Sequence, residues 1–147
     1  MRLPNSPRSI LVVDDDVTLR KVIETGLRMA GYKVIGTCGR DEILALLQSK
    51  QFDLVITDVL MPDIEGTEVI KAVKTHQPDA AILAMSGGGA HLTSELCLAV
   101  ATAMGAGVPL VKPFEMPVLL RAVNRALGSR DATKDAESGG RPEKLNE

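Results

Sequence analysis

The chain has 147 residues, 45% of them apolar, which is enough for one domain with a proper hydrophobic core. Its 17 basic and 19 acidic residues leave a net charge of -2 without a basic block, so direct binding of nucleic acid is not expected. The first ten residues lack a signal-peptide core and no apolar run reaches the length of a membrane span, which predicts a cytoplasmic protein without membrane insertion. Cys38 and Cys97 stand in apolar patterns and are expected to be buried free thiols.

Five short apolar runs predict the strands of this protein. They occupy residues 9–13, 32–38, 53–57, 80–85 and 108–111. The segments between and after them carry apolar residues at helical spacing, in five stripes: Val22, Ile23, Leu27 and Ala30; Ile43, Leu44 and Leu47; Val69, Ile70 and Val73; Leu92, Leu96, Val100 and Ala103; Val118, Leu119, Ala122 and Leu127. Gly31, Gly105 and Gly128 stand where the C-terminal caps of helices are expected.

The strict alternation of strand and helix predicts the fold class. Near-continuous apolar strands are typical of a parallel sheet that helices cover on both faces. We therefore expect an α/β protein with a doubly wound, five-stranded parallel sheet over residues 9–128. Residues 1–8 are expected to form a flexible N-terminus. Residues 129–147, with one leucine and no periodicity, are expected to be a disordered polar tail without an output domain.

Four of the five predicted strands end in a residue that can carry chemistry. Asp14 and Asp15 follow the first strand, Asp58 the third, Ser86 the fourth and Lys112 the fifth. A strand order of 2-1-3-4-5 places these four strands side by side. Ligands of open parallel sheets bind at the carboxyl ends of the strands, near the point where the strand order reverses, so these groups are expected to meet there.

The acidic residues at this edge predict a cation site. The carboxylates of Asp14, Asp15 and Asp58 repel one another unless a cation takes up their charge. Oxygen ligands without His or Cys favour Mg²⁺ over zinc. Asp16 is explained by the stabilisation of an acid in the first turn of a helix. A cation, a lysine, a hydroxyl group and a nucleophilic carboxylate together suit phosphoryl transfer to an aspartate.

Four strings in this order resemble the receiver domain of bacterial two-component response regulators: ILVVDDD, VITDVLMPDIEG, LAMSG and LVKPF. The resemblance extends from about Ser9 to Leu127. It implies a flavodoxin-like, CheY-like (βα)5 fold and a Mg²⁺-dependent phosphoprotein of phosphorelay signal transduction.

The resemblance also implies a role for each residue of the site. Asp58 would be the phosphoacceptor, Ser86 and Lys112 would bind the phosphoryl group, and the backbone N–H of Gly87 would lie beside it. The bond from Lys112 to Pro113 is cis in relatives. Receivers hold Mg²⁺ through four groups, which in this chain would be Asp15 directly, Asp14 mainly through a bound water, Asp58, and the backbone carbonyl of Leu60.

Two features depart from the receiver pattern. Receivers commonly place Tyr or Phe three residues before the lysine, as a switch that reports phosphorylation, whereas this chain has Pro109. The segment between Ser86 and Lys112 is a few residues longer than usual and contains three consecutive glycines. We therefore expect rearrangement of the loop over residues 87–92 and of the following helix to carry the signal.

The resemblance implies a stand-alone response regulator that accepts a phosphoryl group from a sensor histidine kinase. Its output would be phosphorylation-dependent binding of a downstream protein, or transfer of the group to a histidine phosphotransfer protein, and the sequence does not choose between them. No enzymatic activity is expected beyond self-phosphorylation from phosphohistidine and autodephosphorylation.

Two other functions compete with this one. VVDDDVT fits the hydrophobic-DxDxT signature of haloacid-dehalogenase-type phosphohydrolases, with Asp14 as nucleophile and Asp16 as acid–base. That hypothesis lacks the acidic pair required after Lys112 and leaves Asp58 unexplained. A receiver-like scaffold that is not phosphorylated is the third hypothesis, and the complete set of site residues counts against it.

Overall fold

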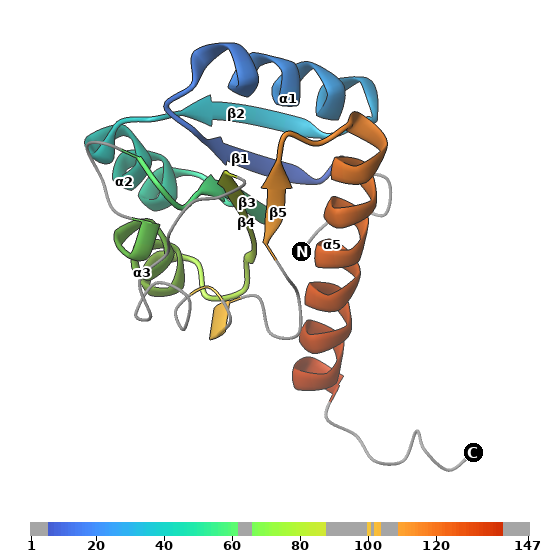
Figure 1. Ribbon diagram of the computed structural model, residues 1–147. Coiled ribbons are helices and arrows are strands. Elements are labelled where there is room, and N and C mark those ends of the chain that lie inside the picture. Colours follow the sequence, from blue (N-terminus) through green and yellow to red (C-terminus); the bar gives the residue numbers. More distant parts are fainter. Residues whose placement is uncertain (1–5, 62–65, 88–99, 101, 104–108, 140–147) are drawn as a thin grey trace.

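The computed structural model of the protein describes residues 6–61, 66–87, 100, 102–103 and 109–139 (Figure 1). Strands and helices alternate along the chain, in the order β1 (Ser9–Val13), α1 (Val17–Met29), β2 (Lys33–Thr37), α2 (Arg40–Ser49), β3 (Leu54–Asp58), α3 (Gly66–His76), β4 (Ala81–Gly87), β5 (Leu110–Lys112) and α5 (Met116–Gly139). Most of the helix expected near residues 92–103 lies outside the described residues. Residues 100, 102 and 103 are helical, and Val100 is buried.

The five strands form one parallel sheet in the order β2-β1-β3-β4-β5. This is the order predicted from the sequence, and the α/β fold class is confirmed. Strand β1 lies between β2 and β3, and Ile10 is the register partner of both Val34 and Leu54. The short β5 pairs only with the carboxyl-terminal end of β4, starting from Met85 opposite Leu110. All carboxyl ends therefore lie along one edge of the sheet.

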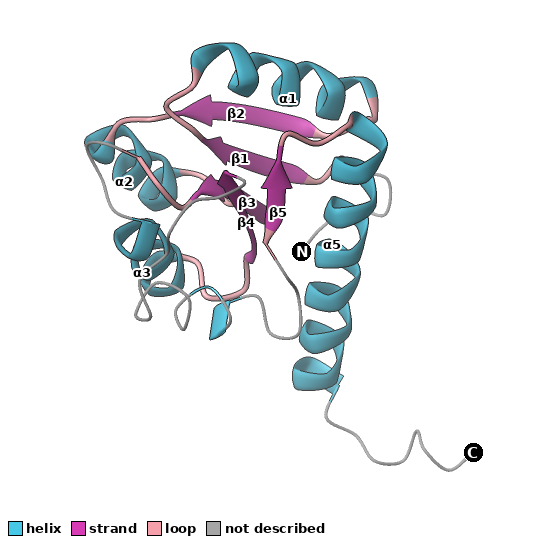
Figure 2. Cartoon of the chain, viewed as in Figure 1, coloured by secondary structure: helices cyan, strands magenta, loops and turns pink. Residues whose placement is uncertain are grey.

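Two helical layers cover the two faces of the sheet (Figure 2). Because successive side chains of a strand point to opposite faces, Leu11 and Val13 pack with α2 and α3, whereas Ile10 and Val12 pack with α1 and α5. The buried helical residues of the two layers are Ile43, Leu47, Val69, Ile70 and Val73 on one face, and Ile23, Leu27, Leu119, Val123 and Leu127 on the other. Burial of each such side chain contributes about 1.5–3 kcal/mol.

Helix α1 has a signal at each end that the sequence predicts. Asp16 is its N-terminal cap, and the Asp16 side chain accepts a hydrogen bond of 3.1 Å from the backbone N–H of Leu19. Gly31, just beyond its C-terminal end, has a φ of 99°, a conformation that favours glycine. Asp16 thus belongs to the start of the helix, as its position suggested.

Helix α5 corrects the boundary expected at residue 128. It spans 24 residues and ends at Gly139, so Gly128 lies inside it and residues 129–139 are helical. The segment 129–139 contains no proline, and alanine, lysine, arginine and glutamate in it have good helix propensity. Among the described residues, no helix is both long and apolar enough to cross a membrane.

Ion pairs of Arg130 and Asp131 attach α5 to the edge of the sheet at which the strands begin. The Arg130 guanidinium lies 3.1 Å from the buried Asp53 carboxylate, and its Nε donates to the carbonyl of Asp79 at 3.0 Å. The neighbouring Asp131 carboxylate pairs with Arg8 at 2.5 Å. We call Arg8, Asp53, Arg130 and Asp131 the amino-edge anchor. These contacts join distant parts of the chain, so a search for local periodicity does not reveal them.

The thiol of Cys38 is exposed, and the prediction that it is buried is wrong. Strand β2 ends one residue earlier, at Thr37, which is the last buried residue of that run. Cys97 lies outside the described residues.

Candidate functional site

Three carboxylates meet at the carboxyl edge of the sheet. Oxygen atoms of Asp14, Asp15 and Asp58 all lie within 4.8 Å of one another. Asp14 is completely buried, Asp58 is 6% exposed and Asp15 faces solvent. Asp14 and Asp15 follow β1 and Asp58 ends β3, so the pairing of these two strands brings the acids together. We call these three residues the acid cluster.

Lys112 bridges two members of the acid cluster. Its Nζ lies 2.9 Å from Asp14 Oδ2 and 2.9 Å from Asp58 Oδ2. Lys112 ends β5, where it is the register partner of Gly87, and a cis peptide bond joins it to Pro113. The ammonium group therefore offsets part of the negative charge of Asp14, which follows β1, and of Asp58, which ends β3.

Burial and hydrogen bonding shift the pKa values of Asp58 and Lys112. Burial of the carboxylate raises the pKa of Asp58, although hydrogen bonds from Lys112 and from the Leu60 N–H, at 3.1 Å, partly oppose the rise. Burial works against the charge of Lys112, but hydrogen bonds to Asp14 and Asp58 outweigh it and the pKa of Lys112 is raised. Lys112 is thus held as a cation.

The backbone around Asp14 is held from three directions. The N–H of Asp14 donates to the carbonyl of Thr37 at 3.2 Å, and the N–H of Asp16 donates to Asp14 Oδ1 at 3.0 Å. The carbonyl of Asp14 accepts a hydrogen bond of 2.8 Å from Arg20 Nη1. Sequence reasoning missed Arg20. The available signal was its place four residues after the cap Asp16, which puts it on the helix face above that cap.

The other predicted site residues lie at the same edge of the sheet. Ser86 and Gly87 end β4 and are both partly buried. Ser86 is the register partner of Val111, next to Lys112. Leu60 is 45% exposed, and its N–H is the group that contacts Asp58. Pro109 immediately precedes β5, whereas most of the 87–92 loop lies outside the described residues.

The acid cluster fits a hard divalent cation. It offers oxygen ligands alone, at mutual distances that one ion can span, and one of the three carboxylates is open to solvent. The Nζ of Lys112 contacts Asp14 and Asp58, the two buried members of the cluster, and Asp15 is the exposed member.

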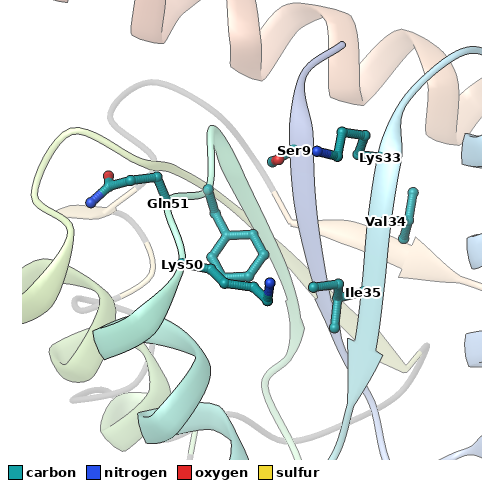
Figure 3. Close-up of a pocket in the computed structure, with 7 residues that line it drawn as sticks. Ser9, Lys33, Val34, Ile35, Lys50 and Gln51 are labelled. Atoms are coloured by element: carbon teal, nitrogen blue, oxygen red, sulfur yellow. The ribbon is translucent and has the colours of Figure 1, made fainter. Parts of the chain in front are cut away.

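A separate cavity of about 310 Å³ lies near the opposite edge of the sheet (Figure 3). Its lining comes from the starts of β1 and β2 and from the turn before β3: Ser9, Lys33, Val34, Ile35, Lys50, Gln51 and Phe52. None of these residues belongs to the acid cluster, so the cavity is not part of the candidate site.

A family comparison decides which kind of protein carries this site. Residues 10–124 match the family described as "Response regulator receiver domain". The chain belongs to this family. The match includes the acid cluster, Lys112 and, apart from Ser9, all five strands of the sheet.

Curated relatives contain this receiver within longer chains. The regulator "DNA-binding transcriptional regulator NtrC" of Azospirillum brasilense is 35% identical over 142 residues, which is 95% of this chain and 29% of that protein. "Response regulator protein FleR" of Pseudomonas aeruginosa is 34% identical over 127 residues, 86% of this chain and 26% of that protein. The receiver thus spans less than a third of the length of these relatives.

Solved receiver structures have the same fold. The receiver domain protein (CheY-like) from Methanospirillum hungatei JF-1 is 29% identical, with a TM-score of 0.76 over 87% of this chain and 99% of that chain. The chemotaxis protein CheY4 of Vibrio cholerae is 32% identical, with a TM-score of 0.70 over 82% of this chain and 99% of that chain. These structures confirm the CheY-like fold that the resemblance to receivers implied.

Proposed function

We propose that this receiver accepts a phosphoryl group on Asp58 from a phosphohistidine of a sensor histidine kinase, in the cytoplasm and with Mg²⁺ as cofactor. The observation that carries the proposal is the position of Asp58, which shares the Lys112 ammonium with the completely buried Asp14 at the edge where β1 and β3 end. Membership of the receiver family supports the same partner class.

The transfer is an in-line substitution at phosphorus. A bond forms from an Asp58 carboxylate oxygen to phosphorus while the bond from phosphorus to the histidine nitrogen breaks, and the electron pair of the broken bond stays on the imidazole. Mg²⁺, when bound by Asp14, Asp15, Asp58 and the Leu60 carbonyl, supplies positive charge that reduces repulsion between carboxylate and phosphoryl oxygens. Lys112, which already contacts Asp58, then binds a phosphoryl oxygen, with Ser86 and the Gly87 N–H beside it.

The phosphorylated receiver signals by a change in protein binding. Two outputs fit: binding of a downstream protein, and onward transfer to a histidine phosphotransfer protein. We propose no catalytic turnover beyond self-phosphorylation and autodephosphorylation, and no direct contact with nucleic acid by this domain.

The phosphohydrolase hypothesis is not supported by the geometry of Asp14. A nucleophile must reach its substrate, but Asp14 is completely buried and its two carboxylate oxygens accept hydrogen bonds from Asp16 N–H and Lys112. The receiver-like scaffold that is not phosphorylated remains the alternative, and the mass measurement below tests it.

Intact mass spectrometry after incubation with a small-molecule phosphodonor and Mg²⁺ tests the proposed function. We expect one phosphoryl adduct in the wild type and in Asp79→Ala, a control at an exposed acid on the amino edge, and none in Asp58→Ala. A wild type without adduct, although it binds Mg²⁺, would support the scaffold hypothesis. An adduct that survives in Asp58→Ala but is lost in Asp14→Ala would support the phosphohydrolase.

A further inference from the structure

Arg20 reaches from α1 to the backbone of the acid cluster. Its side chain is only 16% exposed, and its Nη1 donates to the carbonyl of Asp14 at 2.8 Å. That carbonyl belongs to the peptide group whose nitrogen is the N–H of Asp15. Arg20 therefore holds the peptide unit that joins the buried acid to the exposed acid.

A row of charges lies along α1, and its middle member, Glu24, is the residue that holds Arg20 in place. Its Nε lies 3.5 Å from Glu24 Oε2, and Glu24 Oε1 lies 3.5 Å from Arg28, which donates to the carbonyl of Val34 in β2 at 3.0 Å. The Glu24 side chain is 14% exposed, so this pairing takes place largely out of water.

Gly36 provides the space for this row. A Cβ atom at Gly36 would collide with the Glu24 carboxylate and would lie 3.1 Å from Arg20 Cδ. Only a strand residue without a side chain leaves the Arg20–Glu24 pair room to lie flat against β2. The arrangement thus uses residues of α1, which follows the Asp14–Asp15 turn, and of β2, which pairs with β1.

We propose that Arg20 is a positioning residue that presets the Asp14–Asp15 turn for binding the divalent cation. The N–H of Asp14 is held by Thr37 and its carbonyl by Arg20, so the path of the chain into Asp15 is fixed before an ion arrives. A ligand set that is already ordered binds with a smaller loss of conformational entropy. This inference rests on the proposed function, because it concerns the same cation site.

The charge of Arg20 and its hydrogen bond to Asp14 predict opposite effects on Mg²⁺ affinity when Arg20 is replaced. By Coulomb's law alone, removal of a cation near three carboxylates should strengthen Mg²⁺ binding. Loss of the hydrogen bond to Asp14 should weaken it, because the turn into Asp15 then samples other conformations. The sign of the change in affinity therefore separates the two roles.

Titration calorimetry of the full chain with MgCl₂ measures this sign. We expect Arg20→Lys, which keeps the charge but not the guanidinium geometry, and Arg20→Gln to bind Mg²⁺ more weakly, roughly tenfold for Arg20→Gln, as for other residues that orient metal ligands. Arg28→Gln is the matched control, because it removes the same charge from the same row but contacts Val34 and is 53% exposed. Its affinity should stay within about twofold of the wild type.

A second readout does not require the metal. In the metal-free protein, NMR should show a displaced Asp15 amide resonance and faster exchange of that amide in Arg20→Gln, but not in Arg28→Gln. Glu24→Gln, which keeps Arg20 and the shape of its partner, should give a smaller change in the same direction and serves if the Arg20 variants fail to fold. Unchanged or tighter Mg²⁺ binding in folded Arg20→Gln would overturn the inference. A wild type that does not bind Mg²⁺ would instead overturn the cation part of the proposed function.

Discussion

Lys112 is a largely buried cation at the carboxyl edge of the sheet. It faces two carboxylates, one of them without any exposed surface, and its own side chain is 19% exposed. Charged groups this deep are costly to leave without a partner. The lysine therefore contributes to the stability of the metal-free receiver as well as to its proposed chemistry.

Replacement of Lys112 by Met should lower the free energy of unfolding of the metal-free protein by roughly 2 kcal/mol at pH 7, because two buried carboxylates lose their hydrogen-bond donor. Mg²⁺ should stabilise this variant more than the wild type, since the ammonium no longer competes with the ion. Urea unfolding with and without Mg²⁺ measures both effects. Equal stabilisation by Mg²⁺ in the two proteins would contradict this account.

Gly66 lies where the segment after Asp58 turns into α3. A Cβ atom there would stand 2.6 Å from the carbonyl oxygen and 2.9 Å from the Cα of Val59. We expect Gly66→Ala to cost about 1–3 kcal/mol, because backbone rather than a flexible side chain has to move. Gly128→Ala is the control: an added Cβ meets nothing within 4 Å in α5, and we expect a gain of roughly 0.5–1 kcal/mol. If both variants change denaturant stability in the same direction, the close approach at Val59 is not the cause.

Between the elements, Gln77 joins the ends of α2 and α3 to the start of β3. It is 4% exposed, accepts from the Phe52 N–H at 2.8 Å, and donates to the carbonyls of Leu47 at 2.8 Å and Lys50 at 2.5 Å. One side chain thus satisfies three backbone groups at a turn that no regular hydrogen-bond ladder covers.

Gln77→Leu should lower the free energy of unfolding by roughly 3 kcal/mol, because the variant fills the same space but leaves these backbone groups without partners. Gln51→Leu, at an exposed glutamine of the same turn, should change it by less than about 0.5 kcal/mol. Denaturant unfolding gives both values, and hydrogen exchange of the Phe52 amide should accelerate only in Gln77→Leu. A small effect in Gln77→Leu would mean that water replaces the lost partners.

Across the molecule, the features that local sequence determines were predictable and those that need distant partners were not. The strand order followed from which strands end in a residue that can carry chemistry. The position of Asp16 near the start of a helix was also predicted, whereas the structure makes it the cap before the first turn rather than a member of that turn. The length of α5 was underestimated because Arg130 gains its partner from Asp53, far away in the chain. The contact from Arg20 to the Asp14 carbonyl depends likewise on how α1 packs on β2, which Gly36 alone does not reveal.

Protonation of Asp131 in the amino-edge anchor should weaken the contact that holds α5 to the amino edge of the sheet. Burial by itself would raise the pKa of Asp131, but hydrogen bonding with Arg8 outweighs it and holds that pKa below its ordinary value of 3.8. A carboxylate with a lowered pKa stabilises the folded state above its unfolded pKa, and the stabilisation is lost as the pH falls through the folded pKa. The contribution of Asp131 is therefore present at neutral pH and disappears only below about pH 4.

An NMR titration of the Asp131 carboxyl group checks this expectation. Its midpoint should lie at higher pH in Arg8→Gln than in the wild type, and Arg8→Lys should fall between them, because it keeps the charge but not the two-nitrogen contact. Identical midpoints in all three proteins would show that Arg8 does not hold Asp131 in solution.

The parallel direction of all five strands has a consequence for how this protein can diverge. The last residues of the strands lie at one edge and the first residues of β1, β2, β3 and β4 at the other, so the acid cluster and the amino-edge anchor stand at opposite edges of the sheet. Substitutions at the amino edge can change the stability of the folded domain without altering the acid cluster or Lys112. Substitutions that change stability and substitutions that change signalling can therefore accumulate at separate positions of one small domain.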